Sequence, residues 1–186
     1  MLVARTNMVE GRRRRARGFT LIELLVVIAM VAILAALATP SLRAFAANQA
    51  LSGVTSDLMA ASMTARSTAI NRNRRVIIEP MSGTDWTSGW RVYIDKDGST
   101  DFDASKDEQI IEGQPAPDTV VSNAATITNC APKDKFAYDP DGFLRLDSTL
   151  GNGGVPLKSS VTGRDRCLVF DNSGRTRICG SGTDTC

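Results

Sequence analysis

Residues 18–42 read GFTLIELLVVIAMVAILAALATPSL, and this stretch decides how the rest of the chain is organised. The nineteen residues from Leu24 to Leu42 carry no charge. As a helix they would rise about 28 Å, close to the thickness of a hydrocarbon core. Glu23 lies just inside the apolar run, where a carboxylate facing lipid costs a few kcal/mol. The sequence therefore predicts a membrane-spanning helix with one acidic side chain that needs a partner.

A basic leader precedes the apolar run. The charged residues before Gly18 are Arg5, Glu10, Arg12, Arg13, Arg14, Arg15 and Arg17. By the positive-inside rule, these arginines hold the N-terminus in the cytoplasm. The apolar run exceeds the roughly 7–15 residues of a secretory signal peptide, and no A-x-A cleavage site follows it. An uncleaved signal anchor accounts for these features but leaves Glu23 unexplained.

The junction at Gly18 offers a second interpretation. Gly18-Phe19-Thr20-Leu21-Ile22-Glu23 resembles the type IV prepilin signature, in which a basic leader ends in glycine just before phenylalanine. The resemblance implies that a prepilin peptidase cleaves between Gly18 and Phe19, and that Phe19 is then N-methylated. It also implies that Glu23 meets the N-terminal amine of a neighbouring subunit during assembly. An amine partner would offset the cost of a carboxylate in lipid.

Composition restricts the chemistry of the remaining chain. Without the leader, 16 of the 22 basic residues and 19 of the 20 acidic residues remain, a net charge of −3. A polyanion would therefore need a local basic patch. The chain contains no histidine, which excludes Ser-His-Asp and Cys-His catalysis and removes the usual base at neutral pH. We expect no enzymatic activity and no cofactor.

The order of elements predicts an α+β fold, with one long helix packed on an antiparallel sheet. Beyond the membrane an apolar stripe suited to packing continues the helix: Leu51, Val54, Leu58, Ala61, Ala65 and Ala69. Helix signals fade at residues 71–73. Apolar, often β-branched runs then predict strands at 75–79, 89–94, 109–112, 119–121, 136–138, 143–146, 167–170 and 175–179. Glycines at 151, 153 and 154 predict a flexible surface loop over 150–154.

Three body segments narrow the resemblance. Residues 65–70 (ARSTAI), 90–95 (WRVYID) and the late FDNSGR run at 170–175 resemble the GspH/FimT branch of minor pilins and pseudopilins. This family implies a type IV pilin-like fold and four segments. They are a cleaved leader (1–18), a transmembrane helix (19–42), an amphipathic continuation (43–74) and a β-rich head (75–186).

The same resemblance implies a location and partners. The protein would cross the bacterial inner membrane once, with a cytoplasmic N-terminus and a periplasmic head, and would enter a pilus or pseudopilus after assembly. Its partners would be the prepilin peptidase, the inner membrane and other pilins or pseudopilins.

Four cysteines lie in the last third of the chain. An even number beyond a membrane segment predicts disulfides in an oxidising compartment. Zinc is the weaker alternative, because there is no CxxC pair and no histidine. We favour Cys130–Cys167 and Cys179–Cys186, while Cys167–Cys179 across the last hairpin stays open.

An acidic loop follows the second predicted strand. Its oxygen-rich side chains make it a weak calcium candidate: Asp95, Asp97, Asp101 and Asp103. The glycine stands at the fourth position from Asp95, whereas an EF-hand loop needs it at the sixth. Lys96 and Lys106 also lie within the loop, so we expect a solvated loop without metal.

The last predicted hairpin is the candidate binding element. A three-residue loop at 172–174 with Gly174 left-handed would pair Phe170 with Thr176 and Val169 with Arg177. Arg175 and Arg177 would then project from one face, and two guanidinium groups suit phosphate oxygens. The alternative is a solvated strand in which Asp171 pairs with Arg175.

Nearby residues add to this hairpin. Lys158, Arg164 and Arg166 are candidates to extend its basic surface. The run from Gly174 to Arg177 also resembles the G-R-x-R element of FimT-type pilins, which bind DNA during natural transformation. No aromatic residue lies between the arginines, so base stacking is not expected. We expect the arginines to bind double-stranded DNA through its phosphate backbone.

The sequence leaves three functions open for a non-enzymatic filament subunit. The first is a minor pilin that captures DNA through the hairpin. The second is a structural minor pilin that primes pilus assembly. The third is a GspH-type pseudopilin of a type II protein secretion system.

Overall fold

The computed structural model describes residues 18–122, 130–145 and 153–180. Within these ranges there is one α-helix, α1, which spans Leu21–Arg72. The chain divides into two compact units, Met1–Pro40 and Ser41–Cys186, so α1 contributes its first part to one unit and its second part to the other. The sequence analysis began the β-rich head at residue 75, whereas the structure joins the second part of α1 to the strands as one unit.

The first unit contains the apolar part of α1. The helix begins with a capped turn, in which the backbone N–H of Glu23 donates to Thr20 Oγ1 at 3.2 Å. By length and composition α1 is able to cross a membrane. Its apolar side chains up to Leu37 are exposed, which fits a segment whose surroundings are lipid or other helices rather than its own chain.

The second part of α1 presents one buried face to the strands. Five of the six residues in the predicted stripe are buried and Val54 is half-buried, which confirms the amphipathic helix. Two polar residues, Thr55 and Ser62, are also buried; their hydroxyls donate to helix carbonyl oxygens at 2.6 and 2.9 Å. Asn73 then adopts a left-handed φ of 51°, which ends the helix within residues 71–73, where the sequence predicted its end.

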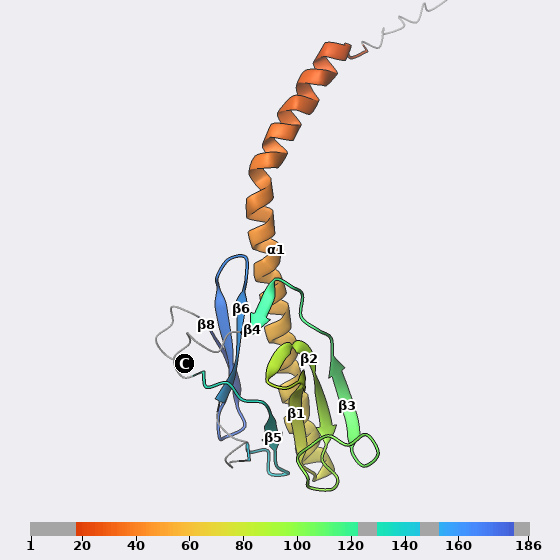
Figure 1. The fold of residues 1–186 in the computed structure, drawn as a ribbon, viewed down its shortest axis with the longest axis vertical. Coiled ribbons are helices and arrows are strands. Elements are labelled where there is room, and N and C mark those ends of the chain that lie inside the picture. The colour runs from red at the N-terminus through yellow and green to blue at the C-terminus, as the bar shows by residue number, and fades with distance from the viewer. Residues whose placement is uncertain (1–17, 123–129, 146–152, 181–186) are drawn as a thin grey trace, which may run out of the picture. The chain divides into compact units, whose positions relative to one another are not determined.

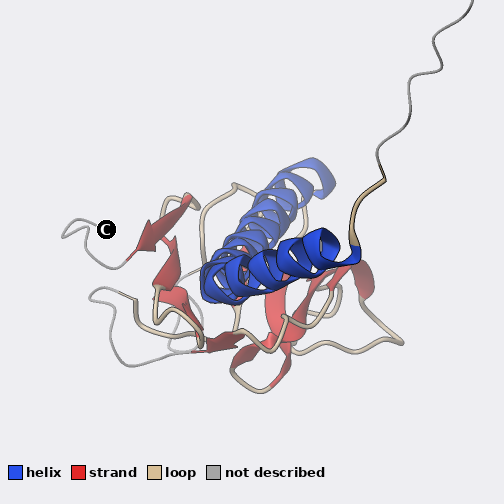
Figure 2. Cartoon of the chain, turned by 90° about the horizontal axis from the view of Figure 1, so that it is seen from above, coloured by secondary structure: helices blue, strands red, loops and turns tan. Residues whose placement is uncertain are grey.

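Two antiparallel sheets cover one side of this helix segment (Figures 1 and 2). The first sheet has the order β3-β2-β1-β5, with bounds β1 Val76–Ser82, β2 Asp85–Ile94, β3 Glu108–Gly113 and β5 Phe136–Tyr138. The second has the order β4-β6-β7-β8, with bounds β4 Val120–Ser122, β6 Gly153–Ser159, β7 Asp165–Phe170 and β8 Thr176–Gly180. The α+β fold agrees with the prediction.

One strand was missed. The predicted loop at 150–154 overlaps the start of β6, while residues 150–152 lie outside the described part of the chain. Gly154 is a glycine because a Cβ there would stand 2.5 Å from the sulfur of Cys167 and 2.8 Å from that of Cys130. The predicted strand at 143–146 is reduced to a bridge between Leu144 and Tyr138, with residue 146 outside the described residues.

The core of the second unit joins the helix and both sheets. Phe136 of β5 stacks on Phe170 of β7 with ring centroids 3.7 Å apart. Beside them, Thr176 of β8 meets the hydroxyls of Ser62 and Tyr138 at 2.9 and 3.1 Å. None of the described residues before Ala47 is buried, so a segment beginning at Ser41 keeps the whole described core and is expected to fold without the first unit.

Candidate functional site

The β7–β8 hairpin has the predicted register. Phe170 pairs with Thr176, and Val169 pairs with Arg177. The backbone N–H of Asp171 donates to the carbonyl of Arg175 at 3.1 Å, closing the loop at 172–174. Gly174 has a φ of +74°, as predicted. This left-handed residue lets a three-residue loop follow the twist of the two strands.

The arginines of the hairpin point to solvent on one side. Arg175 and Arg177 are exposed, whereas Thr176 between them faces inward to Ser62 and Tyr138. Because side chains alternate along a strand, the two guanidinium groups share the outer face. Within the described residues neither guanidinium takes part in an ion pair.

Asp171 is occupied by the loop itself. Its Oδ1 accepts from Ser173 N at 3.1 Å, from Ser173 Oγ at 2.5 Å and from the backbone N of Arg175 at 3.2 Å. Hydrogen bonds, the largest from the Ser173 hydroxyl, hold the pKa of Asp171 below its usual range, and the charge of Arg177 adds to this effect. The sequence left open a pairing of the Asp171 and Arg175 side chains. In the structure, Asp171 instead accepts a hydrogen bond from the backbone N–H of Arg175.

The hairpin tip is held by two other elements. Arg66 on α1 donates from Nη2 to the carbonyl of Ser173 at 3.1 Å, and Leu144 N donates to the carbonyl of Asn172 at 3.2 Å. A Cβ at Gly174 would overlap the carbonyl oxygen of Gly142. The tip is thus fixed to the helix and to the turn after β5, which limits the directions that the arginines can take.

Sequence reasoning missed Arg66 as part of this site. Its partner Ser173 is 107 residues away, and nothing in the helical pattern distinguishes Arg66 from a solvated arginine. For Gly142 the sequence did give an indication, because this glycine ends the turn sequence Asp139-Pro140-Asp141-Gly142. That signal predicted the turn but not its contact with Gly174.

The structure does not bring all the predicted basic residues together. In the strand register, Lys158 of β6 stands opposite Asp165 of β7. Asp165 is four positions along β7 from Val169, the residue that stands opposite Arg177. Four residues of strand correspond to about 13 Å. Arg164 precedes β7 at that same far end. Arg166 is three positions from Val169, so it points to the opposite face of the sheet.

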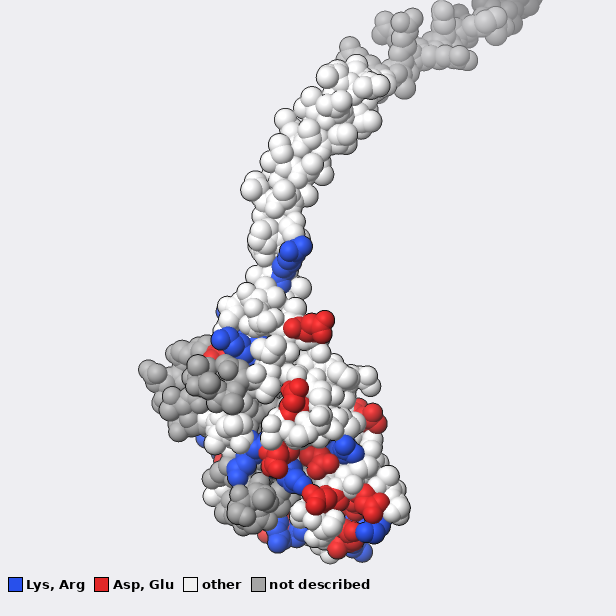
Figure 3. Space-filling model, viewed as in Figure 1, with Lys and Arg blue, Asp and Glu red and all other residues white. Residues whose placement is uncertain are grey.

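The five basic residues of 158–178 therefore form no single patch. Arg175 and Arg177 lie at one end of the hairpin, away from the three predicted helpers. Figure 3 shows one face of the head, on which lysine and arginine side chains are interspersed with aspartate and glutamate. A nucleic acid would thus meet a small basic site rather than a continuous basic surface.

The acidic loop gathers a different set of carboxylates from the predicted one. Asp95, Asp97 and Asp107 bring their oxygens within 4.8 Å of one another. Asp101 instead pairs with Lys135 at 2.8 Å, and Asp103 pairs with Lys106 at 3.2 Å. Sequence spacing missed Asp107 because the loop folds back on itself.

Hydrogen bonds within the loop occupy these oxygens. Asp107 accepts from the backbone N–H groups of Lys96 and Asp103 at 3.0 and 2.9 Å. Bonds from Ser99 chiefly, with help from Lys106, lower the pKa of Asp97 to about 2. A bound ion would have to displace bonds that already satisfy the carboxylates, so the geometry favours a structural loop.

The structure contains the Cys130–Cys167 disulfide that the sequence analysis favoured. Cys179 is disulfide-bonded as well, although its favoured partner Cys186 lies outside the described residues. In the hairpin register Cys179 stands opposite Cys167. The rival Cys167–Cys179 bond is wrong, because Cys167 is bonded to Cys130.

The predicted processing site stands at the start of α1. Gly18, Phe19 and Thr20 precede the helix and are exposed. Thr20 accepts the backbone N–H of Glu23, so Glu23 occupies the third helical position after an N-cap. A carboxylate there is stabilised by the positive end of the helix dipole. This local role for Glu23 was not anticipated from the sequence.

Comparisons with known proteins agree with these features. A family model described as "Type II transport protein GspH" matches residues 54–174, more than half of the chain. A second model, the prokaryotic N-terminal methylation motif, matches residues 13–39. A search of curated proteins found no match.

Two solved structures resemble the fold. The type IV minor pilin FimU of Pseudomonas aeruginosa has a TM-score of 0.50 at 18% identity, covering 73% of this chain and 92% of that chain. The minor pseudopilin EpsH from the Type 2 Secretion System of Vibrio cholerae has a TM-score of 0.49 at 7% identity, covering 71% and 98%. At such low identity, the likeness to FimU indicates a shared fold and no more.

Proposed function

Since this chain belongs to the GspH family, we infer that it is matured and assembled as its N-terminal motif implies. The protein is a minor pilin or pseudopilin of a type IV pilus or a type II secretion machine. We propose that prepilin peptidase cleaves it between Gly18 and Phe19, and that Phe19 is then methylated. The apolar part of α1 anchors it in the inner membrane with a cytoplasmic N-terminus and a periplasmic head.

Glu23 is proposed to pair with the N-terminal amine of a neighbouring subunit. The apolar residues around it are exposed within the chain, so a charge there lacks compensation in lipid unless a partner supplies it. The helix N-terminus compensates part of the charge through its dipole.

Two variants separate these roles of Glu23. Glu23→Gln removes the charge and keeps the length of the side chain, whereas Glu23→Asp keeps the charge. Incorporation into filaments, measured by immunoblotting of sheared filaments, is expected to fall several-fold for the first variant and to persist in part for the second. If Glu23→Gln and the wild type were incorporated equally, Glu23 would serve only to stabilise the N-terminus of α1.

We further propose that the head binds double-stranded DNA through Arg175 and Arg177. The observation that carries this proposal is the exposure of both guanidinium groups on one face of a hairpin whose nearby carboxylate, Asp171, is already engaged by backbone and hydroxyl donors. Two such groups suit adjacent phosphate oxygens. Because Arg66 and Leu144 hold the hairpin tip through hydrogen bonds, the site is preorganised, which lowers the entropic cost of binding.

A gel shift with the segment 41–186 tests this proposal. The segment excludes the leader arginines, which would bind DNA without specificity. A shift at low salt that competes equally with unrelated duplexes supports backbone-led binding. If no gel shift is seen at low salt, the proposal that the head binds DNA is wrong.

Two assembly functions remain as alternatives. The family description names type II transport, which favours a pseudopilin of a secretion machine if DNA does not bind. A structural minor pilin that primes pilus assembly is the other. Deleting the gene separates them, because the first predicts loss of protein secretion and the second predicts loss of surface pili.

A further inference from the structure

The residues that follow the apolar run of α1 include an exposed cation and an exposed ring. The uncharged run ends at Leu42, and Arg43, the first charged residue after it, belongs to the second unit. Arg43 is exposed and takes part in no ion pair with a described residue. Phe45 is exposed as well. Cations beside exposed apolar side chains are typical of segments that lie at the surface of a membrane.

The turn between β6 and β7, residues 160–164, lies beside this part of the helix (Figure 1). Thr162 Oγ1 donates to Asn48 Oδ1 at 2.9 Å. Asn48 is six residues past Leu42, which corresponds to about 9 Å of helix. The headgroup layer on each side of a bilayer is about 5–8 Å thick. With the hydrocarbon ending near Leu42, the turn lies at the headgroups whatever the tilt of the helix, because a tilt only brings Asn48 closer to the membrane.

The turn itself presents an apolar side chain and a cation. All five of its residues are exposed, and Val161 keeps 51% of its surface accessible. Arg164 ends the turn, and its guanidinium takes part in no ion pair with a described residue. Lys158 lies two residues before the turn, at the same end of β6. Together with Arg43, these residues place three cations at the end of the head nearest Leu42.

Two carboxylates accompany these cations. Asp118 is exposed and lies beside the turn, since the carbonyl of the next residue, Thr119, accepts from Ser160 N at 2.9 Å. Asp165, which follows the turn, is buried. The three cations outweigh the exposed carboxylate, so this end of the head is positive although the chain beyond the leader is acidic as a whole. An anionic surface is therefore attracted to this end.

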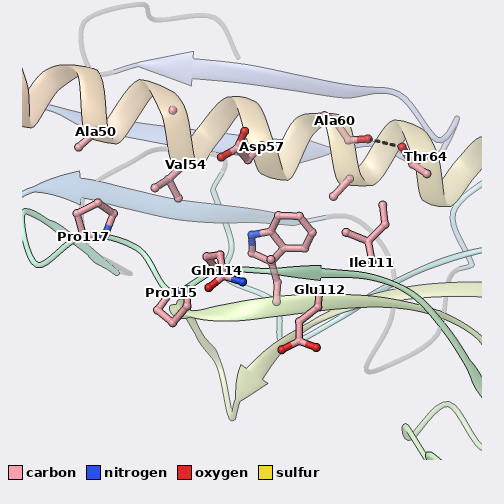
Figure 4. A pocket seen from close by; sticks show the side chains of 14 residues that line it. Ala50, Val54, Asp57, Ala60, Thr64, Ile111, Glu112, Gln114, Pro115 and Pro117 are labelled. Atoms are coloured by element: carbon pink, nitrogen blue, oxygen red, sulfur yellow. Dashed lines mark hydrogen bonds between the residues drawn. The ribbon is translucent and has the colours of Figure 1, made fainter.

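Farther along α1 the surface changes character. A groove between the helix and the segment after β3 has a volume of about 600 Å³. Figure 4 shows Val54, Asp57 and Ala60 on its helix wall, with Gln114 and Pro115 on the facing wall. No lysine or arginine is among the described residues that line it. The groove thus offers no cation to an anionic surface, which limits such a contact to the end of the head near Leu42.

We propose that the turn at 160–164 rests on anionic phospholipid headgroups while the protein is anchored in the membrane. Arg43 and Arg164 bind the lipid phosphates, and Val161 enters the boundary between headgroups and acyl chains. Each basic residue at an anionic membrane surface strengthens binding roughly fivefold. The inference rests on the membrane anchoring proposed above and adds a lipid-binding surface on the head.

This contact would orient the head. The strand β7, Asp165–Phe170, separates the turn at 160–164 from the β7–β8 loop, and its six residues correspond to about 20 Å. Arg175 and Arg177 therefore lie at the end of the hairpin away from the lipid. A head docked in this way keeps those two arginines free for DNA, so the two basic ends of β7 bind different partners.

Photocross-linking of the full chain in vesicles tests the contact. A photoreactive phenylalanine analogue replaces Val161 or, as the matched control, Phe143; the two side chains are 51% and 53% exposed. Phe143 adjoins Leu144, whose N–H donates to Asn172 in the β7–β8 loop, so it marks the opposite end of β7. In vesicles of phosphatidylcholine mixed with phosphatidylglycerol, lipid adducts detected by intact mass should be at least about fivefold more frequent at position 161.

Charge variants identify the groups that bind. Arg43→Gln and Arg164→Gln should each lower the adduct yield at position 161 by up to about fivefold. The double variant should fall to the yield seen in vesicles of phosphatidylcholine alone. Arg74→Gln removes an exposed cation beyond the other end of α1 and should leave the yield unchanged. A double variant that keeps the wild-type yield overturns the proposed role of the two arginines.

Flotation of the same samples separates this inference from the proposed function. A chain that does not float with the vesicles contradicts the membrane anchoring and, with it, the contact. A chain that floats but gives equal adducts at positions 161 and 143, or none at 161, overturns the contact alone. An adduct yield at 161 that is equal with and without phosphatidylglycerol contradicts binding to anionic headgroups.

Discussion

The first part of α1 and the β7–β8 hairpin reveal their roles in different ways. Around Gly18 and Glu23, consecutive residues carry the whole signal, and the matched methylation motif covers residues 13–39. In the hairpin, the arginines gain their orientation from Arg66 and Gly142, which lie far away in sequence. The proposed processing signal depends on neighbouring residues alone, whereas the proposed binding surface exists only after folding.

Gly18→Ala tests the contiguous signal and has the largest expected effect. A side chain at the residue before the cleaved bond removes the glycine that the prepilin signature requires. We expect most of the protein to keep its leader, seen as unprocessed chain by intact-mass analysis of membranes. Phe19→Met, a change on the other side of the bond, serves as the comparison and should be processed more fully. Complete processing of Gly18→Ala would contradict the assignment.

Phe170→Ala tests whether the hairpin belongs to the common core. Phe170 is buried against Phe136, and removing such a ring costs about 3–5 kcal/mol. The free energy of unfolding of segment 41–186 in urea gives the measurement. Phe143→Ala is the matched control, because Phe143 is 53% exposed, and it should lose less than about 1 kcal/mol. Equal losses would mean that the two sheets do not share one core.

Gly174→Ala tests the fixation of the hairpin tip. Both Gly174 and Gly163 have positive φ, at 74° and 71°. A Cβ at Gly163 meets nothing within 4 Å, so Gly163→Ala should cost only the left-handed backbone strain, about 1–2 kcal/mol. At Gly174 the clash with Gly142 adds about 1–3 kcal/mol of overpacking. Equal destabilisation of the two variants in urea would show that the tip does not rest on the turn after β5.

Asp171 gives the smallest effect, through pH. Its pKa is lowered in the folded protein, so its contribution to stability is present above the ordinary pKa near 3.8 and is lost as pH falls through the folded pKa. Asp171→Asn should therefore reduce stability slightly at pH 7, and this difference should shrink as pH falls below about 3.8. Asp141→Asn is the control, because Asp141 is an exposed carboxylate whose Oδ1 accepts a backbone N–H, from Phe143 at 3.0 Å. A wild-type advantage in stability that does not shrink as pH falls below 3.8 would contradict this linkage.

Local patterns predicted the elements well and the assembled surfaces less well. The helix, its buried stripe, seven of the eight described strands and the hairpin register followed from periodicity and turn chemistry. The strand β6 was missed, because Gly153, Gly154 and Pro156 disfavour a strand. Gly154 is needed there for the approach of two cysteine sulfurs, a constraint that arises from contacts distant in sequence.

The basic surface shows the same limit. Lys158, Arg164 and Arg166 lie close to the hairpin arginines in sequence, but strand geometry carries them to its far end or to the other face. Likewise, the predicted calcium residues separated, and Asp107 joined two of them. The sequence shows how many charged residues lie near one another along the chain. The register of a sheet decides which of their side chains face a common partner.

The salt dependence of DNA binding most directly tests whether the guanidinium groups of Arg175 and Arg177 contact phosphates. Each phosphate contact contributes about 0.9 to the slope of log K against log salt. For segment 41–186, replacing Arg175 and Arg177 with alanine should lower the slope by about 2 and weaken binding equally across sequences. Replacing Arg72 and Arg74, at the end of α1, removes the same charge and should have a smaller effect. An unchanged slope in the Arg175/Arg177 variant would contradict the claim.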